Sequence, residues 1–182
     1  AAWKTKWESV RTNFCQIALT PGEDATMLNA GWVSTTKDET PQVKLMDANG
    51  NEIKTYTGVQ STSADVQTVK DGDTTYTLYP CKVTITGLAE NTSYKYYVNG
   101  AWSDTYDYKT QSTDSFSIMY VGDPQIGAST NQLGDQNKEY YAMNDSYNWY
   151  HTLNNAVSKF PNLSFIMSAG DQINQSGSLS KE

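Results

Sequence analysis

Two aspartates that follow two hydrophobic runs are the first residues of this sequence whose spacing could do chemistry. Residues 116–127 read FSIMYVGDPQIG and residues 163–174 read LSFIMSAGDQIN, so Asp123 and Asp171 each follow a glycine at the end of an apolar run. A single aspartate after a strand is often a turn former or a helix cap. Two matching aspartates in one chain favour a shared site instead.

The residues around the aspartates predict two strands joined by a helix. Residues 116–121 and 163–167 are continuous apolar runs, as expected of strands buried on both faces. Residues 145–159 between them have helical spacing, and Pro161 would end that helix. Its apolar stripe is predicted to contain Tyr147, Tyr150, Leu153, Val157 and Phe160.

The start of this helix has two candidate capping residues, Asp145 and Asn144. A strand, a crossover helix and a second strand predict a parallel pair with a right-handed connection. The carboxyl ends of parallel strands share one edge of the sheet, where ligands bind in open α/β folds.

Neighbouring strands would bring the two carboxylates into one small volume, because their backbones are about 4.8 Å apart. Two like charges at that separation are unfavourable unless a cation lies between them or one carboxyl is protonated. Oxygen ligands of this kind suit divalent or trivalent metals. The sequence therefore predicts a metal site that includes Asp123 and Asp171.

The chain before residue 111 has a different pattern of short alternating runs separated by turns. Leu28, Ala30 and Trp32 share one face of such a run, and Asn49-Gly50 is a strong hairpin signal. About seven strands at this spacing, without a helical pattern, predict an antiparallel β-sandwich with Trp32 in its core.

The stretch GLAENTSYKYYV resembles the tyrosine corner of fibronectin type III domains. In that motif the hydroxyl of Tyr94 would bond to the backbone a few residues upstream. The alternative is an ordinary loop followed by an aromatic strand residue.

Cys15 and Cys81 are the only cysteines, and both are in phase with core-facing residues. In a fibronectin-type sheet the first and fifth strands flank the second, so the two residues would lie too far apart for a disulfide. We therefore expect two free, buried thiols.

The composition excludes some partners. A net charge of −7 with a single arginine, Arg11, argues against a nucleic-acid or anionic-membrane surface. No apolar run approaches the roughly 20 residues needed to span a bilayer.

The sequence has no signal peptide, but one could have been cleaved before Ala1. Abundant Thr, Ser, Asn and Asp suit a secreted or cell-surface β-rich protein, which we expect to be bacterial.

GDPQ and GDQIN resemble the first two motifs of calcineurin-like metallophosphoesterases, and QIALTPGEDATMLNAGWVST resembles the N-terminal domain of purple acid phosphatases. The resemblance implies a fibronectin III-like all-β sandwich over residues 1–111. It also implies that residues 112–182 begin an α/β metallophosphoesterase domain with its first βαβ unit. The resemblance further implies two bound metal ions, which could be Fe, Zn or Mn, and a phosphate-ester substrate.

The resemblance assigns site residues one by one. Asp123 would bind the first metal and Asp171 would bridge both. Gln125 stands where many relatives have a metal-binding histidine, and its amide oxygen is a weaker ligand. Asn174 stands where purple acid phosphatases have the iron-bound tyrosine, so it would lie near the metals or substrate, and a branch without the purple colour is favoured.

Later motifs of the family, which carry the remaining ligands, are not in this sequence. Its one histidine, His151, lies in the predicted helix, where we expect a surface or packing role. We therefore expect the chain to be the front part of a longer phosphoesterase, inactive by itself and prone to dimerise or swap through residues after 111. The alternative is an extracellular fibronectin-like binding module with a vestigial phosphoesterase part.

Overall fold

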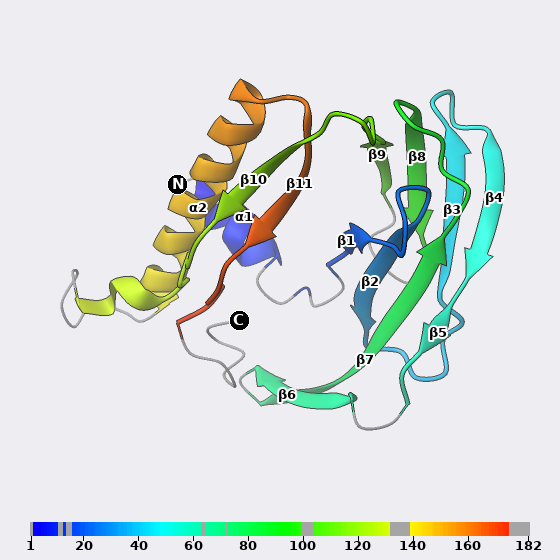
Figure 1. Ribbon diagram of the computed structural model, residues 1–182. Helices are drawn as coiled ribbons and strands as arrows, with labels where there is room; N and C mark the ends of the chain where they lie inside the picture. The colour runs from blue at the N-terminus through cyan, green and yellow to red at the C-terminus, as the bar shows by residue number, and fades with distance from the viewer. Residues whose placement is uncertain are drawn as a thin grey trace. The chain divides into compact units, whose positions relative to one another are not determined.

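The computed structural model describes residues 2–10, 13, 16–62, 65–71, 73–99, 104–131 and 139–174. The chain divides into two compact units (Figure 1), and Thr12–Asp114 form one of them. The other combines the N-terminal segment with the chain from Ser115 onwards. A domain boundary after residue 111 stays a prediction.

The first unit is built from antiparallel strands that form two sheets. One sheet has the order β1-β2-β7-β5, with β6 paired to β7, and the other has the order β4-β3-β8-β9. The seven expected strands correspond to all but β5 and β6, two short additions along β7. The strands are β1 Ala18–Pro21, β2 Leu28–Ser34, β3 Gln42–Asp47, β4 Glu52–Thr57, β5 Val59–Gln60, β6 Gln67–Asp71, β7 Thr74–Ile85, β8 Ser93–Val98 and β9 Thr105–Lys109.

The core of this unit follows from the alternation of its strands. Along β2 every second residue is buried, and Trp32 is only 3% exposed, as predicted. Val43 from β3, Val83 from β7 and Val98 from β8 belong to the same buried cluster. Both sheets thus contribute apolar side chains to one core, and the β-sandwich prediction is confirmed.

The predicted corner at Tyr94 is also confirmed. Its hydroxyl accepts a hydrogen bond from the Ala89 N–H at 2.9 Å, and the tyrosine ring is buried beside Leu88. This bond ties the start of β8 to the preceding loop, as the motif requires.

The structure describes one of the two cysteines, Cys81. Cys81 is buried in β7 opposite Trp32, and β2 separates β1 from β7 as expected. Cys15 lies outside the described residues, so the state of the two thiols stays a prediction.

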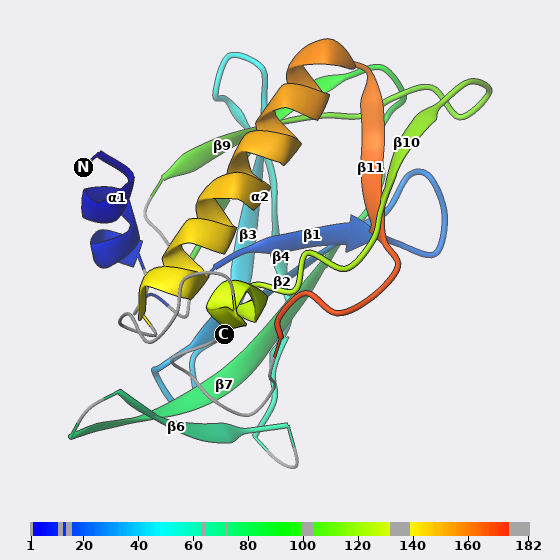
Figure 2. The same ribbon diagram turned by 90° about the vertical axis from the view of Figure 1, so that its left-hand side faces the viewer.

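The second unit contains the expected parallel pair. Strands β10 and β11 run parallel, with Tyr120 opposite Met167, and α2 lies next to them (Figure 2). The parallel pair and the helix between its strands are thus present, while the right-handed connection stays a prediction. The elements are α1 Ala2–Val10, β10 Ser117–Val121, the 3₁₀-helix η1 Ala128–Asn131, α2 Glu139–Lys159 and β11 Leu163–Ser168.

The predicted apolar stripe of α2 is wrong in part. Tyr147 and Tyr150 are substantially exposed and pack on Trp3 of α1, with ring centroids 5.6 and 5.0 Å apart. The Trp3 Nε1–H also donates to the Met143 carbonyl at 3.0 Å. The less exposed side of the helix instead includes Ala142, Ser146, Trp149, Leu153 and Ala156.

The expectation that both strands are buried on both faces is also wrong. Phe116 is 60% exposed and Tyr120 is 67% exposed, and their neighbours on the same face are Ile118 and Met167. We call these four residues the open face. Ile118 is 41% exposed and Met167 is 46% exposed, so none of the four side chains is buried.

Candidate metal-binding site

The chain segments that follow β10 and β11 stay paired beyond the ends of the strands. The Gln125 N–H donates to the Asp171 carbonyl and the Ile126 N–H to the Gln172 carbonyl, both at 3.0 Å. The Asn174 N–H returns a bond to the Ile126 carbonyl, also at 3.0 Å. We call residues 122–127 the first loop and residues 169–174 the second loop. Their pairing holds the two aspartates at one edge of the sheet, as the parallel strands predict.

The two Gly-Asp steps differ in the space that surrounds the glycine. A Cβ atom built on Gly170 would overlap the Asp123 Oδ1 atom, with Asp123 Cγ at 3.6 Å. The corresponding position at Gly122 meets nothing within 4 Å. The Asp123 carboxylate therefore lies directly beside the backbone that leads into Asp171, and the two glycines are not equivalent.

Gln125 adopts a backbone conformation that is uncommon for its type. Its φ is 39°, and Gly127 two residues later has φ 95°. A non-glycine residue in the left-handed region costs free energy, and such residues cluster at functional sites. The Gln125 N–H is bonded to the second loop in this conformation, and Ile126 forms a parallel bridge with Ile173.

Asp145 does not cap α2, because the helix begins at Glu139 and Asp145 lies inside it. Its Oδ2 atom instead accepts hydrogen bonds from Gly127 N–H at 2.9 Å and Ser129 N–H at 3.3 Å. Asp145 thus caps the first turn of η1, directly after the first loop. The other predicted cap, Asn144, is likewise within the helix and is exposed.

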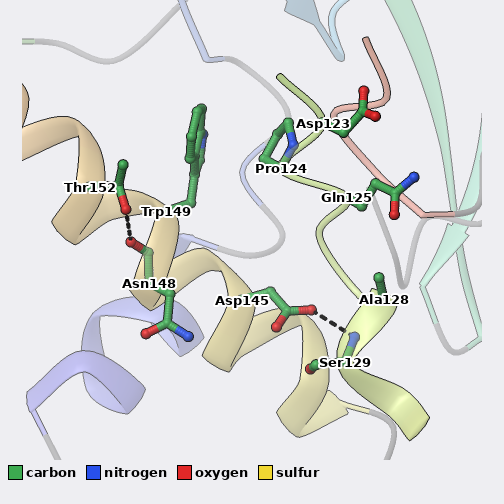
Figure 3. A pocket seen from close by; sticks show the side chains of 9 residues that line it. All are labelled: Asp123, Pro124, Gln125, Ala128, Ser129, Asp145, Asn148, Trp149 and Thr152. Carbon is green, nitrogen blue, oxygen red and sulfur yellow. Dashed lines mark hydrogen bonds between the residues drawn. The ribbon is translucent and has the colours of Figure 1, made fainter. Parts of the chain in front are cut away.

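A polar cavity of about 400 Å³ lies between the first loop and α2 (Figure 3). Asp123 and Gln125 line one side of it, while Asp145 and Trp149 belong to the helix side. Asp171 is not part of its lining. In Figure 3 the side chains of Asp123 and Gln125 point away from α2, so the metal site is better defined by the edge of the sheet than by this cavity.

The available ligands are oxygen atoms, which suit a hard cation, but they are too few for a binuclear site. Asp123 and Asp171 are exposed carboxylates, and Gln125 adds an amide oxygen. Among the described residues, no three His, Cys, Asp or Glu side chains come together as a metal-binding group. A binuclear site needs more ligands than these.

The other two residues considered from the sequence lie differently. Asn174 is exposed at the end of the second loop, and its N–H is bonded to Ile126. His151 is exposed on α2, where its ring packs edge-on against Tyr147 at 4.5 Å. The packing or surface role expected for His151 is confirmed.

The fold and the site together define a β-sandwich followed by a parallel strand pair with two aspartates at its carboxyl edge. A family model for the purple acid phosphatase N-terminal domain matches residues 14–110, more than half of the chain. The chain therefore belongs to the purple acid phosphatase N-terminal domain family.

Among solved structures, the chain is similar to a purple acid phosphatase isolated from yellow lupin (Lupinus luteus) seeds, with 20% identity and a TM-score of 0.47. The match covers 60% of this chain and 22% of the lupin chain. The comparison with curated proteins gives no match.

Proposed function

We propose that this chain supplies the first metal ligands of a metal-dependent phosphoesterase that hydrolyses phosphate esters. The observation that carries the proposal is the pairing of the two loops, which places the Asp123 carboxylate beside Gly170, the residue before Asp171. Membership of the purple acid phosphatase N-terminal domain family supports it.

Each site residue has a role in this proposal. Asp123 would hold the first metal and Asp171 would bridge two metals, while Gln125 would add a weak oxygen ligand and Asn174 would lie near the metals or substrate. Fe, Zn and Mn all accept such ligands. When bound, the metals would supply Lewis-acid activation of phosphate and of water. The residues of this chain hold and orient the cations.

The location of the protein, its source and its association with a second copy are part of the same proposal. We propose a secreted or cell-surface location and a bacterial source. None of the described helices is long and apolar enough to cross a membrane. We also propose that the open face is covered by a second copy of the chain, because exposed strands with apolar side chains favour association.

Metal titration of the purified chain tests the proposal. Mn²⁺ binding is followed by calorimetry for the native chain and for Asp123→Asn and Asp171→Asn, with Asp114→Asn as the control. Asp114 is an exposed aspartate of the first unit. We expect weak binding that either site variant abolishes and the control retains. Binding that survives both site substitutions would rule out this site, and would favour the binding-module alternative.

A further inference from the structure

We propose that Asp145 is a positioning residue that holds the first loop in its metal-binding conformation. This inference rests on the proposed function, because it concerns how the same site is kept in shape. One carboxylate oxygen accepts hydrogen bonds from Gly127 N–H at 2.9 Å and Ser129 N–H at 3.3 Å. Asp145 makes both contacts from inside a long helix, so it fixes the loop to a regular element.

The conformation of the loop explains why it needs to be held. Gln125 and Gly127 both have positive φ, a backbone conformation that glycine adopts readily but glutamine rarely does. The cost of the left-handed conformation at Gln125 must be offset by contacts around it. The first loop is bonded to the second loop on the Gln125 side and to Asp145 on the Gly127 side.

The chemistry of the contact favours a carboxylate. Hydrogen bonds from backbone N–H groups to an ionised acceptor are about twice as strong as those between neutral groups. Asp145 is partly buried, and so are Gly127 and Ser129. Without the carboxylate, two partly buried N–H donors would lose their acceptor, and the loop would gain freedom at Gln125 and Asp123.

Three variants separate this role from a general effect on folding. Asp145→Ala removes the acceptor but places a better helix former in α2, so loss of helix propensity cannot explain a defect. Asp145→Asn keeps one acceptor oxygen without the charge. Asn155→Ala makes the matched change at an exposed position of the same helix.

Two measurements are made on the full chain: Mn²⁺ affinity by water-proton relaxation, and amide hydrogen exchange by NMR. For Asp145→Ala we expect about tenfold weaker Mn²⁺ binding and faster exchange at Gly127, Ser129, Gln125 and Ile126. Asp145→Asn, which keeps a neutral acceptor, should restore part of both properties, and Asn155→Ala should match the native chain. Unchanged Mn²⁺ affinity in Asp145→Ala would overturn the inference.

The exchange data keep the inference separate from the proposed function. If the native chain binds no Mn²⁺, the proposed function fails, and exchange at Gln125 and Ile126 then decides about Asp145. Faster exchange at these two amides in Asp145→Ala would support a positioning role. A change confined to Gly127 and Ser129 would show a purely local contact and would overturn it.

Discussion

The Asp123 carboxylate occupies the space in which Gly170 would carry a Cβ atom, so the residue before one aspartate makes room for the side chain of the other. This contact predicts the effect of Gly170→Ala. The carboxylate can rotate away, so the free energy of unfolding should change by about 1 kcal/mol or less. The free energy of metal binding should be affected more strongly than that of unfolding, because the Asp123 carboxylate would leave its position beside Gly170.

Gly122→Ala is the matched control, since an added Cβ there meets nothing within 4 Å. Mn²⁺ titration and urea unfolding of both variants measure the two effects. Equal metal affinity in the two variants would show that the position of the Asp123 side chain does not matter for binding.

Tyr94→Phe should destabilise the first unit by about 1 kcal/mol, because the Ala89 N–H loses its acceptor in a partly buried loop. Tyr97→Phe, at a less buried position of the same strand, is the control and should have little effect. Urea unfolding followed by tryptophan fluorescence compares them. Similar stability of the two variants would mean that the corner bond contributes nothing.

The stability that Asp47 contributes to the hairpin between β3 and β4 should depend on pH. Its pKa lies below the ordinary value because the Asn51 side-chain amide donates to it at 2.9 Å, with further help from the Asn51 N–H. The folded pKa is the lower one, so the stabilisation is complete above about pH 3.9 and is lost as the pH falls through the lowered pKa.

An NMR titration of the Asp47 carboxyl carbon checks this dependence. Asn51→Ala should raise the pKa of Asp47 towards its ordinary value, whereas Asn29→Ala, whose side chain bonds to Pro21 instead, should not. A pKa that stays low in Asn51→Ala would assign the shift to the backbone donors alone.

Much of the fold could be predicted from residue patterns. The alternation around Trp32, the hairpin at Asn49-Gly50 and the two Gly-Asp segments each depend on local sequence, and the structure has all three elements. Parallel strands also bring Asp123 and Asp171 to one edge through geometry alone. These features needed no knowledge of distant contacts.

The remaining features depend on contacts between distant residues. Asp145 has the chemistry of a helix cap, and it caps η1 instead of its own helix, which the sequence cannot distinguish. Tyr147 and Tyr150 pack on Trp3 of α1, and this contact could not be predicted without knowing that α1 forms. Tyr120 would be buried only if another element packed on it, and a run of apolar residues does not show whether such an element exists.

The open face should make the chain associate at high concentration. Light scattering should show a monomer–dimer equilibrium that Phe116→Ser together with Tyr120→Lys shifts to monomer, because both changes remove exposed apolar surface. Val157→Lys makes a comparable change on α2, where the side chain is also exposed, and should leave the equilibrium unchanged. A native chain that is monomeric throughout would contradict this prediction.

Residues 1–182 should hydrolyse a chromogenic phosphate monoester no faster than buffer when Mn, Zn or Fe is supplied. A binuclear site needs ligands that hold two cations about 3.5–4 Å apart and leave room for water and substrate. Asp123, Asp171 and the Gln125 amide supply too few, and His151 lies on an exposed part of α2. In a longer protein that contains the remaining ligands, we expect activity that Asp171→Ala reduces more than Asp123→Ala, because Asp171 would contact both metals. Metal-dependent turnover by residues 1–182, abolished by Asp171→Ala, would show instead that this chain completes the site by itself.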